Sequence, residues 1–336
     1  MLNRIELTNF GPLRQIEWKN LGPINLIIGA NDTGKTFLLK ALYSGMRTLE
    51  EYKRGDDPRT AAEILADKLH WTFQAEKIGD LVSKGANAAL SCSLSLDHRE
   101  FSYSFGKDTT KQIATVENHV MTRASNSVFL PAKEVLSLYH IILESREEHR
   151  VFGFDDTYLD LARALRQSPK GGKNYSEFGK SRQRLETILG GKVDYDEKSG
   201  WQFKKGNQRF PIGVTAEGIK KIAILDTLLG NRYLGTDSII FIDEPEAALH
   251  PVAISQLLEI VAMLAGRGIQ FFLASHSYFV VKKLFLIAQE NSLSIPVISA
   301  DRNSWQYADL KDGMPDNSII NESIELYRQE VELALQ

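Results

Sequence analysis

The stretch INLIIGANDTGKT, residues 24–36, decides the fold of this chain. Its apolar first half has the length of a buried strand and leads into the pattern G-x-x-x-x-G-K-T, which starts at Gly29 and ends at Thr36. The sequence FLLKALYSGMRTLEEY, residues 37–52, follows with the spacing of a helix. A strand, a glycine-containing loop and a helix in this order predict a phosphate-binding loop within an α/β fold.

Each residue type in this loop suits contact with phosphate. Gly29 and Gly34 permit backbone conformations that aim N–H groups inward, and the following helix adds its positive end. Lys35 is a mobile positive charge for the β- and γ-phosphates, and the hydroxyl of Thr36 is a ligand for Mg²⁺. The predicted nucleotide-binding residues of the loop are Gly29, Asn31, Asp32, Thr33, Gly34, Lys35 and Thr36.

Two further apolar runs end on polar side chains. The first leads into FIDEPEAALHP, residues 241–251, and ends on Asp243 and Glu244. We expect Asp243 to hold Mg²⁺ and Glu244 to polarise the attacking water as a general base. The second, GIQFFLASHS at residues 268–277, ends on His276, which we expect to contact the γ-phosphate and the water. The alternative is that the acid pair caps a helix and that His276 is structural.

The composition sets the class of protein. The chain has 336 residues, of which 43% are hydrophobic, enough for one large domain with insertions or for two smaller ones. A net charge of −3 gives no general basic field for nucleic acid. A single cysteine, Cys92, excludes an intrachain disulfide. The sequence lacks a signal peptide and an apolar run long enough to span a membrane, so we expect a cytoplasmic protein without a membrane partner.

Together these motifs resemble the ABC-type ATPases of the SMC, RecF and OLD group. The resemblance covers residues 1–48 and 205–310, through IELTNFGPL, the phosphate loop, DEPEAALHP and His276. It implies an ABC-ATPase head with a mixed central sheet, an antiparallel β subdomain and an inserted helical subdomain. It also implies ATP and Mg²⁺ as ligands, with ATP held between two copies of the chain. No Glu and Asp-x-Asp set follows His276, so we expect no TOPRIM domain of the OLD nuclease type.

The resemblance also implies a signature helix that meets the nucleotide of the partner copy. Its counterpart is VTAEGIKKIAILDTLLG, residues 214–230, with Thr215 as N-cap and Gly218 close to phosphate. The sequence departs from the family here, because Ala216 replaces the serine and Glu217 the first glycine. Dimer-driven hydrolysis is therefore less firmly implied than ATP binding. No clear glutamine loop is present, and Lys133 or Glu134 is the candidate replacement.

The remaining segments divide the chain as follows. The predicted parts are an N-lobe with the phosphate loop (1–55), a helix and antiparallel β part (56–130), a helical insertion (131–204), a C-lobe (205–310) and a closing helix (311–336). We expect residues 56–85 to be largely helical, Cys92 to lie on the buried face of a hairpin, and SPKGGKNY, 168–175, to be a linker. The closing helix has an apolar side, which we expect to pack against the head.

Three functions remain open at this point. The first is an ATPase that controls a separately encoded effector, a nuclease or toxin, as compact SMC/OLD-like ATPases do in bacterial anti-phage systems. The second is a RecF-like ATPase for DNA repair, with GKSRQR and KKGNQR contacting phosphates. The third is a nucleotide-gated scaffold with little turnover, which Ala216 favours. The altered signature and the missing glutamine loop make a transporter subunit the least supported alternative.

Overall fold

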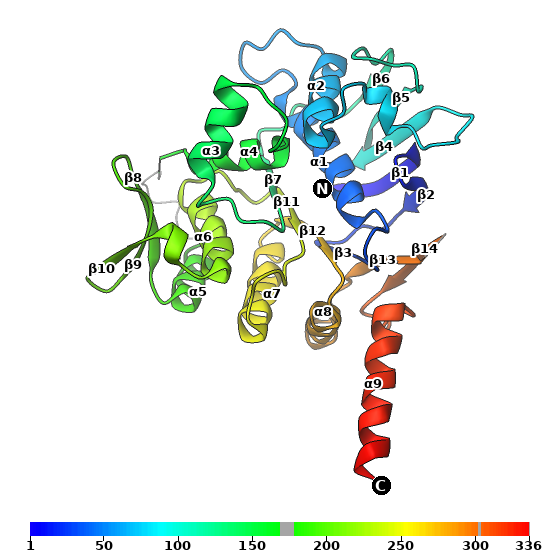
Figure 1. Ribbon diagram of the computed structural model, residues 1–336. Coiled ribbons are helices and arrows are strands. Elements are labelled where there is room, and N and C mark those ends of the chain that lie inside the picture. Colours follow the sequence, from blue (N-terminus) through cyan, green and yellow to red (C-terminus); the bar gives the residue numbers. More distant parts are fainter. Residues whose placement is uncertain (169–177, 302–303, 336) are drawn as a thin grey trace.

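The computed structural model describes residues 1–168, 178–301 and 304–335, and a six-stranded sheet runs through its centre (Figure 1). The strands are, in spatial order, β14 (Ser304–Asp309), β13 (Pro296–Asp301), β3 (Ile24–Gly29), β12 (Gln270–Ser275), β11 (Ile239–Asp243) and β7 (Ser127–Leu130). All neighbours are parallel except β14, which runs antiparallel to β13. This is the predicted mixed central sheet, and β3 carries the phosphate loop.

Two antiparallel sheets flank this centre. The five-stranded sheet contains β2 (Leu13–Trp18), β1 (Leu2–Phe10), β4 (Leu90–Leu96), β5 (Arg99–Phe105) and β6 (Thr115–Asn118). The three-stranded sheet contains β10 (Gln208–Pro211), β9 (Gly200–Lys205) and β8 (Lys192–Asp196). The predicted hairpin is β4–β5, and Cys92 lies buried on its inner face opposite Tyr103. Burial raises the pKa of the Cys92 thiol to about 12, so this cysteine belongs to the core.

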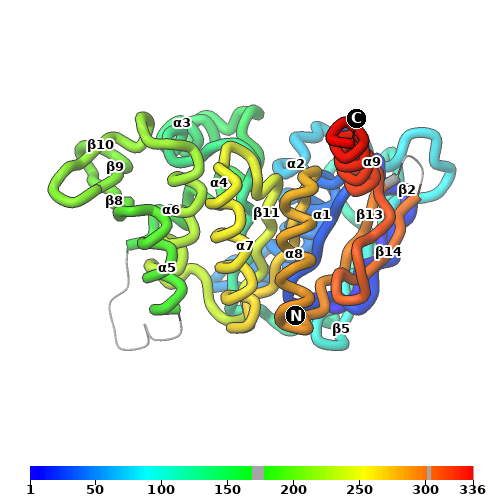
Figure 2. The backbone as a smooth tube through the Cα atoms, turned by 90° about the horizontal axis from the view of Figure 1, so that it is seen from below, coloured from blue at the N-terminus to red at the C-terminus, as the bar shows by residue number. Residues whose placement is uncertain are grey.

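The helices cover both faces of the central sheet. They are α1 (Lys35–Glu51), α2 (Ala61–Phe73), α3 (Tyr139–Leu143), α4 (Asp156–Leu165), α5 (Gly179–Leu189), α6 (Glu217–Gly230), α7 (Pro251–Ala265), α8 (Tyr278–Asn291) and α9 (Ser318–Ala334). Short 3₁₀ or π turns lie at Ile78–Leu81, Glu144–Glu148 and Ile212–Val214. Helices α6, α7 and α8 lie side by side on one face, whereas α1 lies on the other (Figure 2).

The alternation of side chains along β3 explains this layering. Ile24, Leu26 and Ile28 point into the apolar core that contains α6, α7 and α8. Ile27 points into the other core, which α1 shares with the five-stranded sheet. Successive side chains of a strand face opposite sides, so a strand that is apolar throughout must be covered on both. Helix α1, which starts at Lys35 in the phosphate loop, is therefore packed between the central sheet and the five-stranded sheet.

The structure corrects three expectations about the outer segments. Residues 56–85 contain only α2 and a 3₁₀ turn, because Thr60 caps α2 at its start and Gln74 ends it with a left-handed backbone (φ 52°). The closing helix α9 buries only Ile320, and it extends away from the head (Figure 1). The expected packing of α9 is therefore wrong, because its apolar side chains Ile324, Tyr327 and Val331 are 44%, 65% and 39% exposed. The N-cap of α6 is Ala216, not Thr215, whose hydroxyl instead faces the carbonyl of Pro211.

Two other expectations concern the limits of the chain's parts. The predicted linker, 168–175, lies outside the described residues except for Ser168. The division of the chain into five parts stays a prediction, although the segment 131–204 contains α3, α4 and α5 before the three-stranded sheet begins. Among the described residues, no helix combines the length and apolar character that crossing a bilayer requires.

Candidate functional site

The order of strands brings the predicted site residues to one edge of the central sheet. Strand β12 lies between β3 and β11, and all three are parallel. Their carboxyl ends therefore meet at the same edge, which is where parallel sheets present their active residues. The phosphate loop follows β3, Asp243 ends β11, and His276 comes directly after β12. Segments that are more than 200 residues apart in the sequence are thus adjacent in the fold.

The phosphate loop has the backbone that its glycines predicted. Gly29 has φ 153° and Gly34 has φ 90°, and both conformations disfavour side chains. A Cβ atom on Gly29 would lie 2.8 Å from the Cβ of Ala300, and one on Gly34 would lie 2.9 Å from Leu13 Cδ2. Larger residues at these two positions would therefore strain the loop and also displace its neighbours.

The other loop residues differ in exposure. Asn31 and Asp32 are exposed, and Asp32 also has a left-handed backbone (φ 64°). Thr33 donates its hydroxyl hydrogen bond to the carbonyl of Ala30 at 2.9 Å, which closes the turn. Lys35 is buried, and its ammonium donates to the carbonyls of Gly29 (2.8 Å) and Ala30 (2.7 Å). Burial lowers the pKa of Lys35 against the opposing effect of Asp243, so a negative ligand would offset the desolvation of this ammonium.

Thr36 and Asp243 are in direct contact. The hydroxyl of Thr36 lies 3.0 and 2.9 Å from the two carboxylate oxygens of Asp243. Burial raises the pKa of Asp243 although the Thr36 hydrogen bond opposes that rise, so the carboxylate would gain from a cation. An oxygen-only pair of hydroxyl and carboxylate suits Mg²⁺, whose remaining ligands are usually water and substrate phosphates. No cluster of three or more His, Cys, Asp or Glu side chains with metal-binding geometry occurs in the described part of the chain.

Glu244 and His276 face each other at the mouth of the site. The Nδ1 atom of His276 lies 3.3 Å from Oε1 of Glu244, and both side chains are partly exposed. Glu244 has a left-handed backbone with φ 47°, which a residue with a side chain adopts only under constraint. Two backbone hydrogen bonds supply that constraint: Glu244 N–H donates to Ala274, and its carbonyl accepts from Nζ of Lys221 at 2.8 Å.

Two residues of this site were missed at the level of sequence, and one of them is Lys221. It reaches from α6 to the segment after β11, and burial lowers its pKa despite the nearby carboxylates of Glu246 and Asp243. The predicted signature helix thus contacts the acid motif of its own chain. Gly218 lies in the same helix, where a Cβ atom would come within 2.4 Å of Leu249 Cδ2. A larger residue at Gly218 would therefore have to displace the side chain of Leu249 in the same chain.

The second missed residue is Glu246, which holds the segment after β12. Its Oε1 atom accepts hydrogen bonds from the hydroxyl of Ser275 (2.8 Å) and the backbone N–H of His276 (3.2 Å). The same oxygen lies 3.7 Å from Nδ1 of His276. Its other oxygen is buried without a hydrogen-bond partner among the described residues. The signal in the sequence was the second glutamate of DEPE, one residue beyond the proline.

We expect Glu246→Ala to lower kcat for ATP about tenfold or more, because it removes two hydrogen bonds from a charged acceptor. ATP affinity should stay within about twofold, because Glu246 contacts neither Lys35 nor Thr36 through a hydrogen bond. Steady-state kinetics and equilibrium ATP binding measure the two effects. Glu246→Gln keeps an acceptor oxygen and should recover most of the rate, and exposed Glu290→Ala on α8 is the control. Equal losses in all three variants would contradict a positioning role for Glu246.

Two other polar residues, His250 and Glu134, have contacts of their own. His250 is the N-cap of α7, where its Nδ1 accepts from the backbone N–H of Val252 at 3.3 Å. Glu134, a candidate for the missing glutamine, accepts from the backbone N–H of Ser137 and lies 3.9 Å from Nζ of Lys220. Lys133 is exposed. Neither candidate has a hydrogen bond to the phosphate loop among the described residues, so the glutamine loop has no replacement that the geometry identifies.

Comparison with known proteins places this geometry in a family. Residues 95–282, more than half of the chain, match the family described as "AAA domain, putative AbiEii toxin, Type IV TA system". No curated protein sequence matches the chain. One similar solved structure is an SMC head bound to the C-terminal winged-helix domain of ScpA, with 12% identity, a TM-score of 0.53 and coverage of 92% of this chain and 97% of that one.

A second solved structure supports the same fold. It is an SMC head from Pyrococcus furiosus with an extended coiled coil, bound to the C-terminal domain of ScpA. The identity is 11%, the TM-score is 0.50, and the match covers 98% of each chain. At identities this low, structural similarity establishes the fold alone. The two matches confirm the ABC/SMC-type head that the motifs predicted. The chain therefore belongs to the AAA-domain family of that description, and its fold is that of an SMC-type ATPase head.

Proposed function

We propose that this protein hydrolyses ATP and uses the cycle to control a separately encoded effector, a nuclease or toxin, in bacterial anti-phage defence. The family and the fold support a nucleotide-binding ATPase. The observation that carries hydrolysis is the contact of four groups at one sheet edge: Thr36 with Asp243, and Glu244 with His276. Attack by water on a phosphoryl group requires ligands for a metal ion and a general base that is held in position. The first pair would supply the ligands and the second the base.

The proposed roles follow from where each side chain lies. Lys35 and the loop amides would hold the β- and γ-phosphates, and Thr36 and Asp243 would hold Mg²⁺. Bound Mg²⁺ would neutralise charge that develops on the phosphates. Glu244 would accept the proton of the attacking water, and His276, 3.3 Å from it, would orient that water and contact the γ-phosphate.

Self-association and a protein partner are further parts of the proposal. In the ABC-type ATPases that the sequence resembles, ATP is held between two heads. In such a dimer, Gly218 would approach the phosphates bound to the partner copy. The solved SMC heads that share this fold are bound to another protein, ScpA, which supports a protein partner for this head as well. The family description names a toxin of a toxin–antitoxin system, which supports a place for this chain in a system of that class.

The DNA-repair alternative has less support from the structure. Of the GKSRQR segment, Arg182 pairs with Asp226 at 2.7 Å and Arg184 pairs with Glu259. Paired arginines are neutralised and would have to leave their acids to bind phosphates. Salt-dependent binding of duplex DNA to the purified protein would restore this alternative.

The nucleotide-gated scaffold is the second candidate function, and one observation favours it. The N-cap of α6 is Ala216, which offers no side-chain hydrogen bond to the helix N-terminus. A serine in its place would supply one more donor to a phosphate. With Ala216 and without that donor, the protein would bind ATP and close on its partner copy but hydrolyse ATP slowly.

The effector proposal is tested by capture of the Glu244→Gln protein from its native host with ATP and Mg²⁺. This change removes the base but keeps the proposed metal ligand Asp243, so the ATP-bound state should persist. We expect one companion protein in a fixed ratio, identified by mass spectrometry. The matched control adds Lys35→Ala to Glu244→Gln, which should remove ATP binding and release the companion. Recovery of nucleic acid and repair factors without such a companion would contradict the proposal.

A further inference from the structure

A second cavity lies at the far end of α1 from the phosphate loop. Its volume is about 950 Å³, and α1, α2, α4 and the π turn at Glu144–Glu148 all contribute to its wall. Lys35 starts α1 and Glu51, which lines the cavity, ends it, so the two sites are separated by about 24 Å of helix. Cavities of a few hundred to about 1,000 Å³ are the usual size for small-molecule sites.

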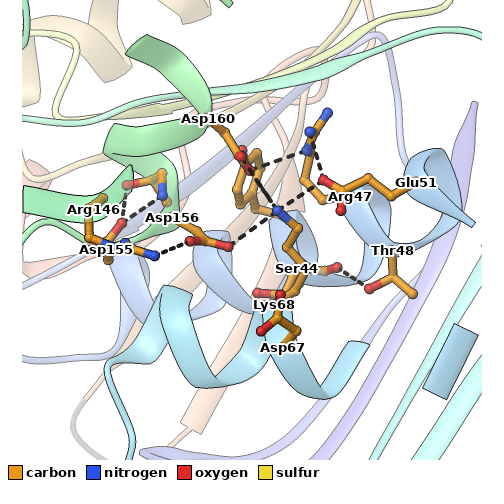
Figure 3. Close-up of polar contacts among 12 residues, drawn as sticks. Ser44, Arg47, Thr48, Glu51, Asp67, Lys68, Arg146, Asp155, Asp156 and Asp160 are labelled. Carbon is orange, nitrogen blue, oxygen red and sulfur yellow. Dashed lines mark hydrogen bonds and ion pairs between the residues drawn. The ribbon is translucent and has the colours of Figure 1, made fainter. Parts of the chain in front are cut away.

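The floor of this cavity is a network of buried charges (Figure 3). Lys68 lies 2.9 Å from Glu51, 3.2 Å from Asp156 and 3.1 Å from Asp160. Arg47 and Arg146 complete the buried ion network of the cavity wall, which consists of Arg47, Glu51, Lys68, Arg146, Asp156 and Asp160. Arg47 also pairs, at 3.2 Å, with buried Glu50, which does not line the cavity. The Nε atoms of both arginines are buried without a hydrogen bond among the described residues, although Nε of Arg47 lies 3.4 Å from a carboxylate oxygen of Asp160. The protein therefore leaves part of their donor capacity unused.

The pairing of charges explains which side chains can bind a ligand. Eight basic and six acidic side chains line the cavity, so basic groups exceed acidic groups by two. Most of the basic groups pair with those acids, for example Arg59 with Asp57 and Arg163 with Glu147. Two exposed arginines of the rim do not: no carboxylate pairs with Arg54 or Arg150 among the described residues.

Arg54 and Arg150 are held at the rim by different means. Arg54 donates to the side-chain oxygen of Asn126 (2.7 Å) and the carbonyl of Ala124 (2.9 Å), which fix its position without cancelling its charge. Arg150 lies two residues after the π turn Glu144–Glu148 and has a left-handed backbone with φ 52°. The planar guanidinium group binds phosphate oxygens in pairs and is the side chain of choice for this purpose.

We propose that this cavity is a second binding site, separate from the phosphate loop, for a small organic phosphate with about two negative charges. The two rim arginines that have no carboxylate partner among the described residues, Arg54 and Arg150, match the charge of a phosphate monoester near neutral pH. The six acids in the wall would repel the continuous charge of a nucleic acid, which is why the ligand is small. Lys40, one turn after Thr36, forms an ion pair with Asp155, the N-cap of α4, and this pair connects the start of α1 to a helix that lines the cavity.

The test is calorimetric titration of the Lys35→Ala protein, in which the phosphate loop is disabled. The ligands are a nucleoside monophosphate, a sugar phosphate, inorganic phosphate and a short DNA duplex. We expect a nucleoside monophosphate or a sugar phosphate to bind with one-to-one stoichiometry, and the stronger of the two identifies the organic part. Adding Arg54→Ala and Arg150→Ala should weaken that binding at least tenfold, whereas Arg267→Ala, at an exposed position outside the cavity lining, should change it less than twofold.

Several results would overturn this assignment. Loss of all phosphate binding in Lys35→Ala would place the ligand in the phosphate loop. Equal affinity for inorganic phosphate would show that the organic part is not recognised, and binding of the duplex alone would make this a nucleic-acid site. An unchanged affinity after loss of Arg54 and Arg150 would exclude the cavity. Both arginines are exposed, so the variants should melt at the wild-type temperature, and this measurement verifies that they fold.

Discussion

Glu244→Gln is expected to lower the ATP turnover of this protein at least about 100-fold, the usual contribution of a positioned general base. Glutamine has nearly the same shape as glutamate but cannot accept the proton of the attacking water. Asp243 and Thr36 keep their contact of 2.9–3.0 Å, so the affinity for ATP and Mg²⁺ should stay within about threefold. Phosphate release and equilibrium nucleotide binding measure the two quantities.

The controls separate loss of the base from disturbance of the loop. Glu244 has a left-handed backbone that Lys221 and Ala274 hold in place, and glutamine retains both backbone contacts. Glu290→Gln, at an exposed position of α8, removes a glutamate outside the Glu244–His276 pair and should leave turnover within about twofold. A wild-type protein that binds ATP but turns over at the background rate would favour the nucleotide-gated scaffold. Unchanged turnover in Glu244→Gln would exclude Glu244 as the base.

The sequence predicted the parts of the site that are local in the chain. A phosphate loop is a run of eight residues whose glycines set its backbone, so its position and shape can be read from the pattern. Asp243 and His276 could be predicted because each follows an apolar strand, and parallel strands place their ends together. The order β3–β12–β11 then fixes which of these residues meet.

The missed contacts depend on distances that no local pattern encodes. Lys221 belongs to a helix that is amphipathic for packing, and only the folded chain directs its ammonium at the carbonyl of Glu244. Glu246 acts through a turn with left-handed Ala248 and through a strand 29 residues away. The apolar side of α9 was visible in the sequence, but periodicity shows that such a side exists and not what covers it.

The buried ion network is the largest feature that sequence reasoning did not find. Its members come from α1, α2, the π turn and α4, and Lys68 and Asp160 are 92 residues apart. Burial lowers the pKa of Lys68, but Asp160, Asp156 and Glu51 outweigh this and hold it well above the usual range. Burial raises the pKa of Asp160, yet Lys68 and Arg47 hold it below the ordinary value for an aspartate. The charges of Lys68 and Asp160 are therefore maintained by their partners.

Asp160→Ala should consequently lower the free energy of unfolding by about 3 kcal/mol, because it leaves Lys68 and Arg47 short of a buried partner. It also removes the acceptor of the Tyr43 hydroxyl, 2.8 Å away. For a chain of this size the melting temperature should fall by about 4 °C. Asp67→Ala is the matched control, because Asp67 also lines the cavity but is half exposed and pairs only loosely with Arg59, so its loss should cost about 0.5 kcal/mol or less.

The double variant Lys68→Met/Asp160→Leu distinguishes a network that stabilises the fold from a network that binds a ligand. Replacing a buried ion pair by apolar side chains of similar size is often neutral or stabilising, whereas removing one partner is not. We therefore expect the double variant to recover most of the stability that Asp160→Ala loses. Its affinity for the organic phosphate should nevertheless fall, because Lys68 and Asp160 form the floor of the second cavity. A double variant as unstable as the single one would mean that the charges stabilise the fold, and retained phosphate affinity would exclude the network from the binding site.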